Sequence, residues 1–193
     1  MASIGTRSLI SAILFAWLGM ISSGCRAQRA SNPQPPTTIL IVRHAEKLDD
    51  GEANLSPAGA ARAGLLPQMF GSRTDLPTPQ VLFAARSTTH SDRPTQTLTP
   101  LAEALHLPID DRFNDHQYAD LAAELLSGRY AGKVVLVVWH HGRIPQLAIA
   151  LGATPPYNPW PAQQYDRIWR IDYINGKATL HDLPIGLMPG DSR

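Results

Sequence analysis

The stretch "TTILIVRHAEKLDD", residues 37–50, joins a short apolar run to a group of charged side chains. Residues 39–42 are all aliphatic, which predicts a strand buried on both faces, because a half-buried strand alternates polar and apolar positions. Arg43 and His44 follow this run directly. In open α/β sheets, ligands bind at the carboxyl ends of the strands. We therefore take Arg43 and His44 as the first candidates for a functional site.

The rest of the chain alternates apolar runs with segments of helical periodicity. Strands are expected at 38–42, 81–85 and 134–139. Helices are expected from Ser56-Pro57 to a limit at Pro67, from Pro94 with a kink at Pro100, from 118 to Gly128, and from 144 to Gly152. Asn175-Gly176 stands between two alternating runs and predicts a hairpin. The pattern predicts an α/β fold, a three-layer α/β/α sandwich with a mostly parallel central sheet and a C-terminal antiparallel hairpin.

Composition limits the class of protein. The chain has 193 residues, of which 44% are hydrophobic and 17% charged, which fits one globular core of ordinary size. The formal net charge of +1 gives no argument for a nucleic acid as partner. Cys25 is the only cysteine, so the sequence carries no disulfide framework.

The first residues have the layout of a secretory signal, with one cation, Arg7, before an apolar stretch at 9–21. Cys25 resembles the lipidated cysteine of bacterial lipoproteins. We therefore predict a signal peptide over 1–24, a Pro-rich tether over 25–36 and one domain over 37–193. Arg26 after the cysteine indicates, by resemblance to enterobacterial sorting, an outer-membrane lipoprotein facing the periplasm. The alternative is cleavage after Ala27, which would release a soluble periplasmic protein.

Polar clusters follow each of the three predicted core strands. Arg43-His44 follow the first, Arg86, Thr89 and Arg93 follow the second, and His140-His141 follow the third. Because the carboxyl ends of parallel strands meet at one edge of a sheet, these side chains are expected to converge. Guanidinium groups offer forked donors that match phosphate oxygens, and helix N-termini add backbone N–H groups. The sequence therefore predicts an anion-binding pocket.

Five segments, taken in order, resemble the motifs of one family. "LIVRHAEK" (40–47 with its flanking strand) resembles the Arg-His-Gly signature of the histidine phosphatase superfamily, whose fold is phosphoglycerate mutase-like. The segments that follow in matching order are "LSPAGAARA" (55–63), "HSDRPTQTLTPLA" (90–102), "FNDHQYADL" (113–121) and "WHHGRIP" (139–145). The resemblance runs from about residue 38 to 182.

The resemblance implies a phosphomonoester hydrolase that needs no cofactor and acts on a small phosphorylated substrate. His44 would attack phosphorus and become phosphohistidine, and Asp115 would protonate the leaving oxygen. The phosphate would be held by Arg43, His44, Arg93, His140 and Thr89. Asp115 stands where glutamate is commoner, Trp139 where glycine is usual, and Thr89 where serine is typical.

Three other interpretations remain open at this level. His44, Asp115, His140 and His141 are metal-ligand types, but no HExxH or cysteine pattern organises them, and two arginines oppose a bound cation. We therefore expect no metal. A lipid-anchored protein that binds a phosphorylated ligand without turnover is the non-enzymatic alternative. A phosphoglycerate mutase-like phosphotransferase is the third, which the short chain disfavours.

The predicted lipid anchor can be tested by cell fractionation. Replacing Cys25 with alanine removes the acceptor thiol, so Cys25→Ala should move the protein from the membrane fraction to the soluble fraction. A wild-type protein that is soluble and unlipidated in the periplasm would instead support cleavage after Ala27.

Overall fold

The computed structural model describes residues 1–2, 34–48 and 51–192, and the predicted lipidation site Cys25 and most of the predicted signal peptide and tether lie outside these ranges. The sheet is formed by β1 (Thr38–Arg43), β2 (Val81–Ala84), β3 (Ile109–Asp110), β4 (Val134–Trp139), β5 (Arg167–Ile174) and β6 (Lys177–Pro184). The helices are α1 (Pro57–Met69), α2 (Arg93–Leu105), the 3₁₀ turn η1 (Asp115–Gln117), α3 (Tyr118–Leu126) and α4 (Ile144–Ala150).

The six strands form one sheet with the order β3-β2-β4-β1-β5-β6. β1 pairs in parallel with β4, β4 pairs in parallel with β2, and β2 pairs in parallel with β3. β5 and β6 extend the other side as antiparallel strands. Because β1, β2, β3 and β4 all run in the same direction, their carboxyl ends meet at one edge of the sheet.

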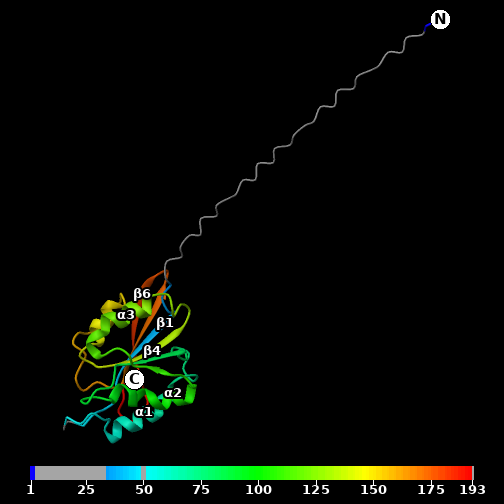
Figure 1. Ribbon diagram of the computed structural model, residues 1–193. Helices are drawn as coiled ribbons and strands as arrows, with labels where there is room; N and C mark the ends of the chain where they lie inside the picture. The colour runs from blue at the N-terminus through cyan, green and yellow to red at the C-terminus, as the bar shows by residue number, and fades with distance from the viewer. Residues whose placement is uncertain (3–33, 49–50, 193) are drawn as a thin grey trace. The chain divides into compact units, whose positions relative to one another are not determined.

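Helices cover both faces of the sheet and create two apolar layers. One core cluster joins Leu121 of α3 and Leu147 of α4 to strand residues such as Ile41. The other joins Leu66 of α1 and Leu98 of α2 to the opposite faces of the same strands. Figure 1 shows α1 and α2 on the side of the sheet away from α3. This arrangement confirms the predicted three-layer α/β/α sandwich.

The predicted hairpin is also confirmed. Asn175 and Gly176 connect β5 to β6, and both have positive φ angles, 52° and 76°. Two consecutive positive φ values characterise the tight turn that matches the twist of antiparallel strands, and asparagine and glycine tolerate them best. Within the described part of the chain, no helix has the length and apolar character needed to cross a membrane.

Some boundaries differ from the sequence prediction. α1 continues through Pro67 to Met69 instead of stopping at the proline, and the predicted strand at 81–85 ends at Ala84. The short strand β3 and the turn η1 were not predicted from the sequence. β3 has only two residues, too few to show a strand periodicity, and it forms because it pairs with β2 at the sheet edge.

The segment after β1 packs tightly against the start of α1. The Ser56 hydroxyl accepts a hydrogen bond from the Gly59 N–H at 3.1 Å, and the Glu46 carbonyl accepts one from the Ser56 N–H at 2.9 Å. The Glu46 carboxylate pairs with buried Arg62 at 2.7 Å, and Arg62 also pairs with Asp191 at 2.8 Å. These contacts fix the backbone that follows His44.

Gly59 is the most sensitive position in this contact. A Cβ atom at residue 59 would lie 2.2 Å from the Glu46 carbonyl oxygen, so Gly59→Ala must displace backbone. We expect a loss of about 1–3 kcal/mol in the free energy of unfolding, measured by denaturant titration. Gly64 of the same helix is the matched control, because a Cβ there meets nothing within 4 Å. Gly64→Ala should be neutral or stabilising by up to about 1 kcal/mol, and equal losses for both variants would contradict this account.

Candidate active site

The parallel pairing of β1 with β4 brings two histidines together. Arg43 and Trp139 are register partners at the ends of these strands, so His44 and His140 follow at the same edge. The His44 N–H also donates to the Trp139 carbonyl at 3.0 Å. The two imidazole rings meet edge to face, with centroids 5.2 Å apart. The predicted convergence of Arg43-His44 with His140 is therefore present.

The environment of His44 defines its protonation. His44 is 2% exposed, and its Nδ1 lies 2.8 Å from the Ala45 carbonyl oxygen. A carbonyl only accepts hydrogen bonds, so Nδ1 carries the proton and Nε2 carries the lone pair. Burial lowers the pKa of His44 well below its usual range, and the nearby His140 and Arg43 act in the same direction. His44 is thus a neutral imidazole with a nucleophilic Nε2.

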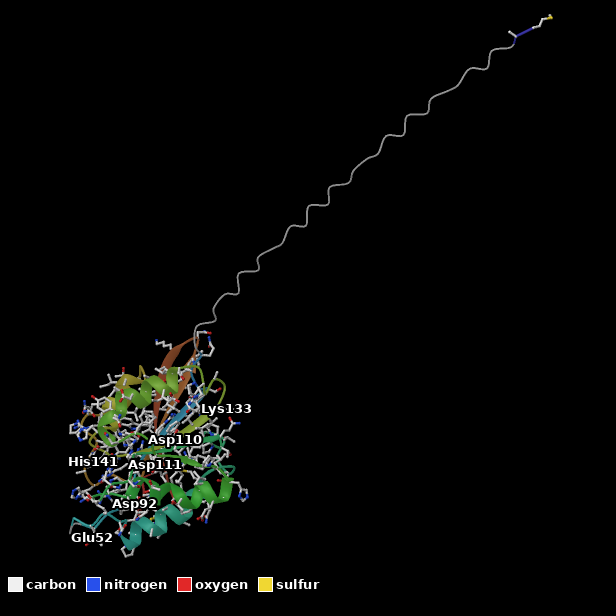
Figure 2. All side chains as sticks on the ribbon, viewed as in Figure 1. Glu52, Asp92, Asp110, Asp111, Lys133 and His141 are labelled. Carbon is white, nitrogen blue, oxygen red and sulfur yellow. The ribbon has the colours of Figure 1, made fainter. Side chains whose placement is uncertain are left out.

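A cavity of about 440 Å³ opens at this edge of the sheet. It is lined by His44, Lys47, Arg93, Asp115, His140, His141, Gly142 and Arg143. Lys133 precedes β4 and His141 follows its last residue by two positions, and Figure 2 shows these residues on opposite sides of the domain. Because His140 and His141 line the cavity, it lies at the carboxyl end of β4. Three cationic side chains and one carboxylate line it, which makes it suited to an anion.

Arg93 enters the cavity as the first residue of α2. Its Nη1 donates to the Glu52 carbonyl at 2.6 Å, whereas its buried Nε has no hydrogen-bond acceptor among the described residues. Thr97, one turn further along α2, accepts from the Ala45 N–H at 2.9 Å and donates to the Arg93 carbonyl at 2.8 Å. The Thr97 hydroxyl therefore couples the position of Arg93 to the segment that carries His44.

Arg43 lies beside the cavity without lining it. Its Nη1 donates to the Ala162 carbonyl at 2.5 Å, and its Nη2 donates to the Tyr165 hydroxyl at 2.9 Å. The guanidinium also lies 3.7 Å from the centre of the Tyr165 ring. Its buried Nε has no acceptor among the described residues. Arg43 thus holds the 161–165 loop, and burial lowers its pKa to about 10, which leaves it cationic at neutral pH.

The pKa values of His140 and His141 are lowered, which favours the neutral form of both rings. Burial lowers the pKa of His140 to about 4, and Arg93 and Arg43 add to this effect against the opposing charge of Asp115. Burial, with Arg43 and Lys47, also lowers the pKa of His141. A neutral imidazole can still donate one hydrogen bond to an anion, so both rings remain suited to phosphate recognition.

Asp115 begins the 3₁₀ turn η1 at the rim of the cavity. Its side chain is 36% exposed, and Asn114 caps the turn by accepting from the His116 N–H at 3.0 Å. Among the described residues that line the cavity, Asp115 is the only one with a carboxylate. An aspartate at the open side of an otherwise cationic pocket is placed to exchange protons with a bound group.

Thr89 does not join this group. It lies at the tip of an exposed turn between Thr88 and Ser91, which pair with each other through their backbones. The Thr88 hydroxyl accepts from the backbone N–H groups of His90 and Ser91 and so tightens the turn. The phosphate contact predicted for Thr89 stays a prediction that this geometry does not support.

Three neighbours of the site were not identified as such from the sequence. Lys47 and Arg143 line the cavity, and Arg143 donates to His116 Nδ1 at 3.0 Å. Tyr165 contacts Arg43 although the two residues are far apart in the sequence. No periodicity or spacing signals these roles, because each depends on how a loop folds back over the sheet edge.

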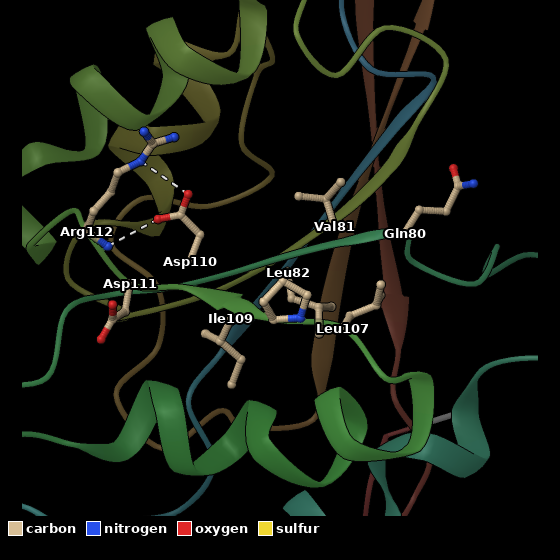
Figure 3. A pocket seen from close by; sticks show the side chains of 9 residues that line it. Gln80, Val81, Leu82, Leu107, Ile109, Asp110, Asp111 and Arg112 are labelled. Carbon is tan, nitrogen blue, oxygen red and sulfur yellow. Dashed lines mark hydrogen bonds and ion pairs between the residues drawn. The ribbon is translucent and has the colours of Figure 1, made fainter.

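The described residues include no group of three or more histidine, cysteine, aspartate or glutamate side chains arranged to hold a metal ion. A second hollow of about 480 Å³ lies at the other side of the sheet, beside β3 (Figure 3). Val81, Leu107 and Ile109 line it, together with the ion pair of Asp110 and Arg112 at 3.1 Å. This hollow brings together no set of reactive groups.

Comparison with known proteins identifies the fold. No protein-family profile and no curated protein sequence matches the chain. Among solved structures, the chain is similar to a protein histidine phosphatase, SixA, in complex with tungstate, with 18% identity and a TM-score of 0.54 over 77% of this chain and 97% of that one. It is also similar to a candidate alpha-ribazole-5′-P phosphatase from Escherichia coli, with 15% identity and a TM-score of 0.57. A mycobacterial glucosyl-3-phosphoglycerate phosphatase with VO3 is similar at 15% identity and a TM-score of 0.55. Each comparison covers 79% of this chain and 100% of the other. The fold is that of the histidine phosphatases, as the sequence resemblance predicted.

The depressed pKa of His140 predicts a pH-dependent stability. The unfolded chain takes up a proton near pH 6.5, whereas folded His140 does so near pH 4, so its contribution is present above pH 6.5 and is lost as the pH falls to 4. This difference corresponds to about 3 kcal/mol in the free energy of unfolding. The His140→Gln variant should therefore lose less stability than the wild type between pH 7 and pH 4 in denaturant titrations. His90→Gln, the same change in an exposed turn, should follow the wild-type curve, and parallel curves for His140→Gln would contradict the shift.

Proposed function

We propose that this chain is a phosphomonoester hydrolase that works through a phosphohistidine on His44 and needs no metal ion. The observation that carries the proposal is the state of His44: a buried, neutral imidazole whose Nδ1–H is held by the Ala45 carbonyl, which leaves Nε2 as the nucleophile. The tungstate and VO3 complexes among the structures of the same fold add support, because both ions are oxyanions.

In the first step, the Nε2 lone pair of His44 attacks phosphorus and forms a P–N bond. The P–O bond to the leaving group breaks in line, and the carboxyl group of Asp115 donates its proton to the departing oxygen. The alcohol leaves, and the enzyme retains a phosphorylated imidazolium and an Asp115 carboxylate. The hydrogen bond from Nδ1 to the Ala45 carbonyl stabilises the positive charge of that imidazolium.

In the second step, a water molecule attacks phosphorus while the Asp115 carboxylate accepts its proton. The P–N bond breaks, and its electron pair returns to His44 Nε2. Inorganic phosphate leaves, so the net reaction adds one water across the ester bond. The same carboxylate serves as acid and then as base, which returns it to its starting state.

The hydrogen-bond donors around His44 suit the phosphoryl group in transit. Its equatorial oxygens carry the charge of the transition state, and donors that are already in place stabilise that charge most effectively. We assign this role to Arg93 and His140, which line the cavity, and to Arg43, whose buried Nε has no acceptor within residues 34–48 and 51–192. A buried charged donor without a partner is costly, and an oxyanion would relieve that cost.

Binding without turnover and transfer to a second substrate are the competing functions. The Asp115 carboxylate at the rim favours turnover, since a site that only binds an anion gains nothing from a nearby negative charge. Hydrolysis and transfer differ in whether water or an alcohol accepts the phosphoryl group, and product analysis separates them. For the cellular location, we propose export and lipid attachment at Cys25, with the signal-like N-terminal sequence as the support.

The proposal is tested by comparing two leaving groups. An alkoxide needs a proton as it departs, whereas p-nitrophenolate leaves without one. Asp115→Asn should therefore lower kcat/KM for an alkyl phosphate by about 10²–10⁴-fold and for p-nitrophenyl phosphate far less. His44→Ala should abolish turnover of both, and EDTA should leave the wild-type rate unchanged. The trapped phosphoenzyme should survive alkali and hydrolyse in acid.

Two exposed residues outside the cavity provide matched controls. Asp111→Asn repeats the Asp115→Asn change, and His90→Ala repeats the His44→Ala change, each at an exposed position. Both variants should retain wild-type rates. Equal losses on both leaving groups in Asp115→Asn would remove the acid role from Asp115. Labelled phosphate on the His44→Ala protein would disprove the nucleophile assignment. Ligand binding with no phosphate release by the wild type would favour the binding protein.

A further inference from the structure

Trp139 connects β4, the strand that His140 follows, to the turn that begins with Asp115. It is the last residue of β4, and its side chain is fully buried in the core cluster that also contains Phe83, Leu121 and Ile144. Its indole Nε1–H donates to the Asp115 backbone carbonyl at 3.2 Å. An indole nitrogen is a donor only, so the direction of this bond is fixed.

Other contacts hold the residues on either side of Asp115. Within the segment, Gln117 accepts from the Asn114 N–H at 3.2 Å, which stiffens the turn locally. From outside, the Arg86 N–H donates to the Phe113 carbonyl at 2.8 Å, and Arg143 contacts the largely exposed His116. The Trp139 indole thus ties the backbone of Asp115 to the buried core.

The backbone position matters because an aspartate side chain is short. Its carboxyl group is one methylene from Cα and follows the backbone closely. The Asp115 side chain is partly exposed, and His116 Nε2 lies 3.6 Å from its Oδ1, too far for a hydrogen bond. Where Asp115 can deliver a proton is therefore set largely by where its main chain is held.

We propose that Trp139 is a positioning residue for proton transfer by Asp115. Its rigid side chain sets the separation between the carboxyl group at the cavity rim and the phosphate site next to His140. This inference rests on the proposed function, since it requires that Asp115 protonates the leaving group. Trp139 itself does not line the cavity and touches no reacting atom.

Trp139→Phe tests the role, because phenylalanine keeps an aromatic ring in the core and removes the N–H. The readout is kcat/KM, which reports the steps up to loss of the leaving group and excludes hydrolysis of the phosphoenzyme. We expect about a 10-fold or greater loss on an alkyl phosphate and less than about a 3-fold loss on p-nitrophenyl phosphate. In an Asp115→Asn background, Trp139→Phe should cause no further loss on the alkyl phosphate.

Trp169→Phe is the matched control. Trp169 is fully buried in the same core cluster, and its indole N–H donates to the Tyr157 hydroxyl at 3.3 Å instead of to Asp115. Trp169→Phe removes about as much buried packing as Trp139→Phe, but no hydrogen bond to Asp115. It should therefore change kcat/KM for both substrates by the same factor. If Trp139→Phe unfolds at the assay temperature, β-(3-benzothienyl)alanine at position 139 keeps both rings, lacks the N–H and should give the same selective loss.

The outcomes separate the inference from the function on which it rests. Equal losses on both substrates for Trp139→Phe, or losses that add to those of Asp115→Asn, would overturn the positioning role while leaving the hydrolase intact. A wild type without turnover, or an Asp115→Asn variant without leaving-group selectivity, would overturn the proposed function and the role of Trp139 with it.

Discussion

The in-register parallel pairing of β1 with β4 is the constraint on which the site depends. The register places Arg43 beside Trp139, and the hydrogen bond from the His44 N–H to the Trp139 carbonyl extends the pairing by one residue. The two histidines that follow these strands then meet with ring centroids 5.2 Å apart. A slip of one residue would turn every side chain of β1 to the opposite face of the sheet, and both apolar layers oppose such a slip.

Burial controls the chemistry that this geometry allows. His44 is itself almost fully buried and lies near Arg43 and Arg93, so the neutral imidazole is favoured over the imidazolium. A neutral ring is what a nucleophile requires, and the Ala45 carbonyl decides which nitrogen carries the lone pair. The same burial leaves the Nε atoms of Arg43 and Arg93 without an acceptor in the described part of the chain. In the proposed mechanism, burial thus prepares both the attacking atom and the donors for an anion.

Contacts away from the cavity hold these groups in place. The Glu46–Arg62–Asp191 ion pairs and the close approach of Gly59 to Glu46 fix the backbone beyond His44. Glu46 is therefore committed to a structural pair. Arg43 combines two roles, because its guanidinium supports the 161–165 loop while its charge acts on His44 and His140. A variant at Arg43 would disturb loop and pocket together, which makes Arg93 the cleaner probe of anion binding.

The sequence by itself determined the α/β class, the order of the main strands and helices, the Asn175-Gly176 hairpin, and the convergence of His44, Arg93 and His140. Each of these follows from local periodicity, from turn chemistry or from the rule that parallel strands end at one edge of the sheet. Only the tertiary structure decided that Thr89 stands in an exposed turn, that Arg143 lines the cavity, that Tyr165 contacts Arg43, and that Trp139 holds Asp115. These contacts join residues from different loops, and local sequence patterns carry no information on how loops pack across a sheet edge. The identity of a residue sets what it can donate or accept, but its partner is chosen by the packing of the whole chain.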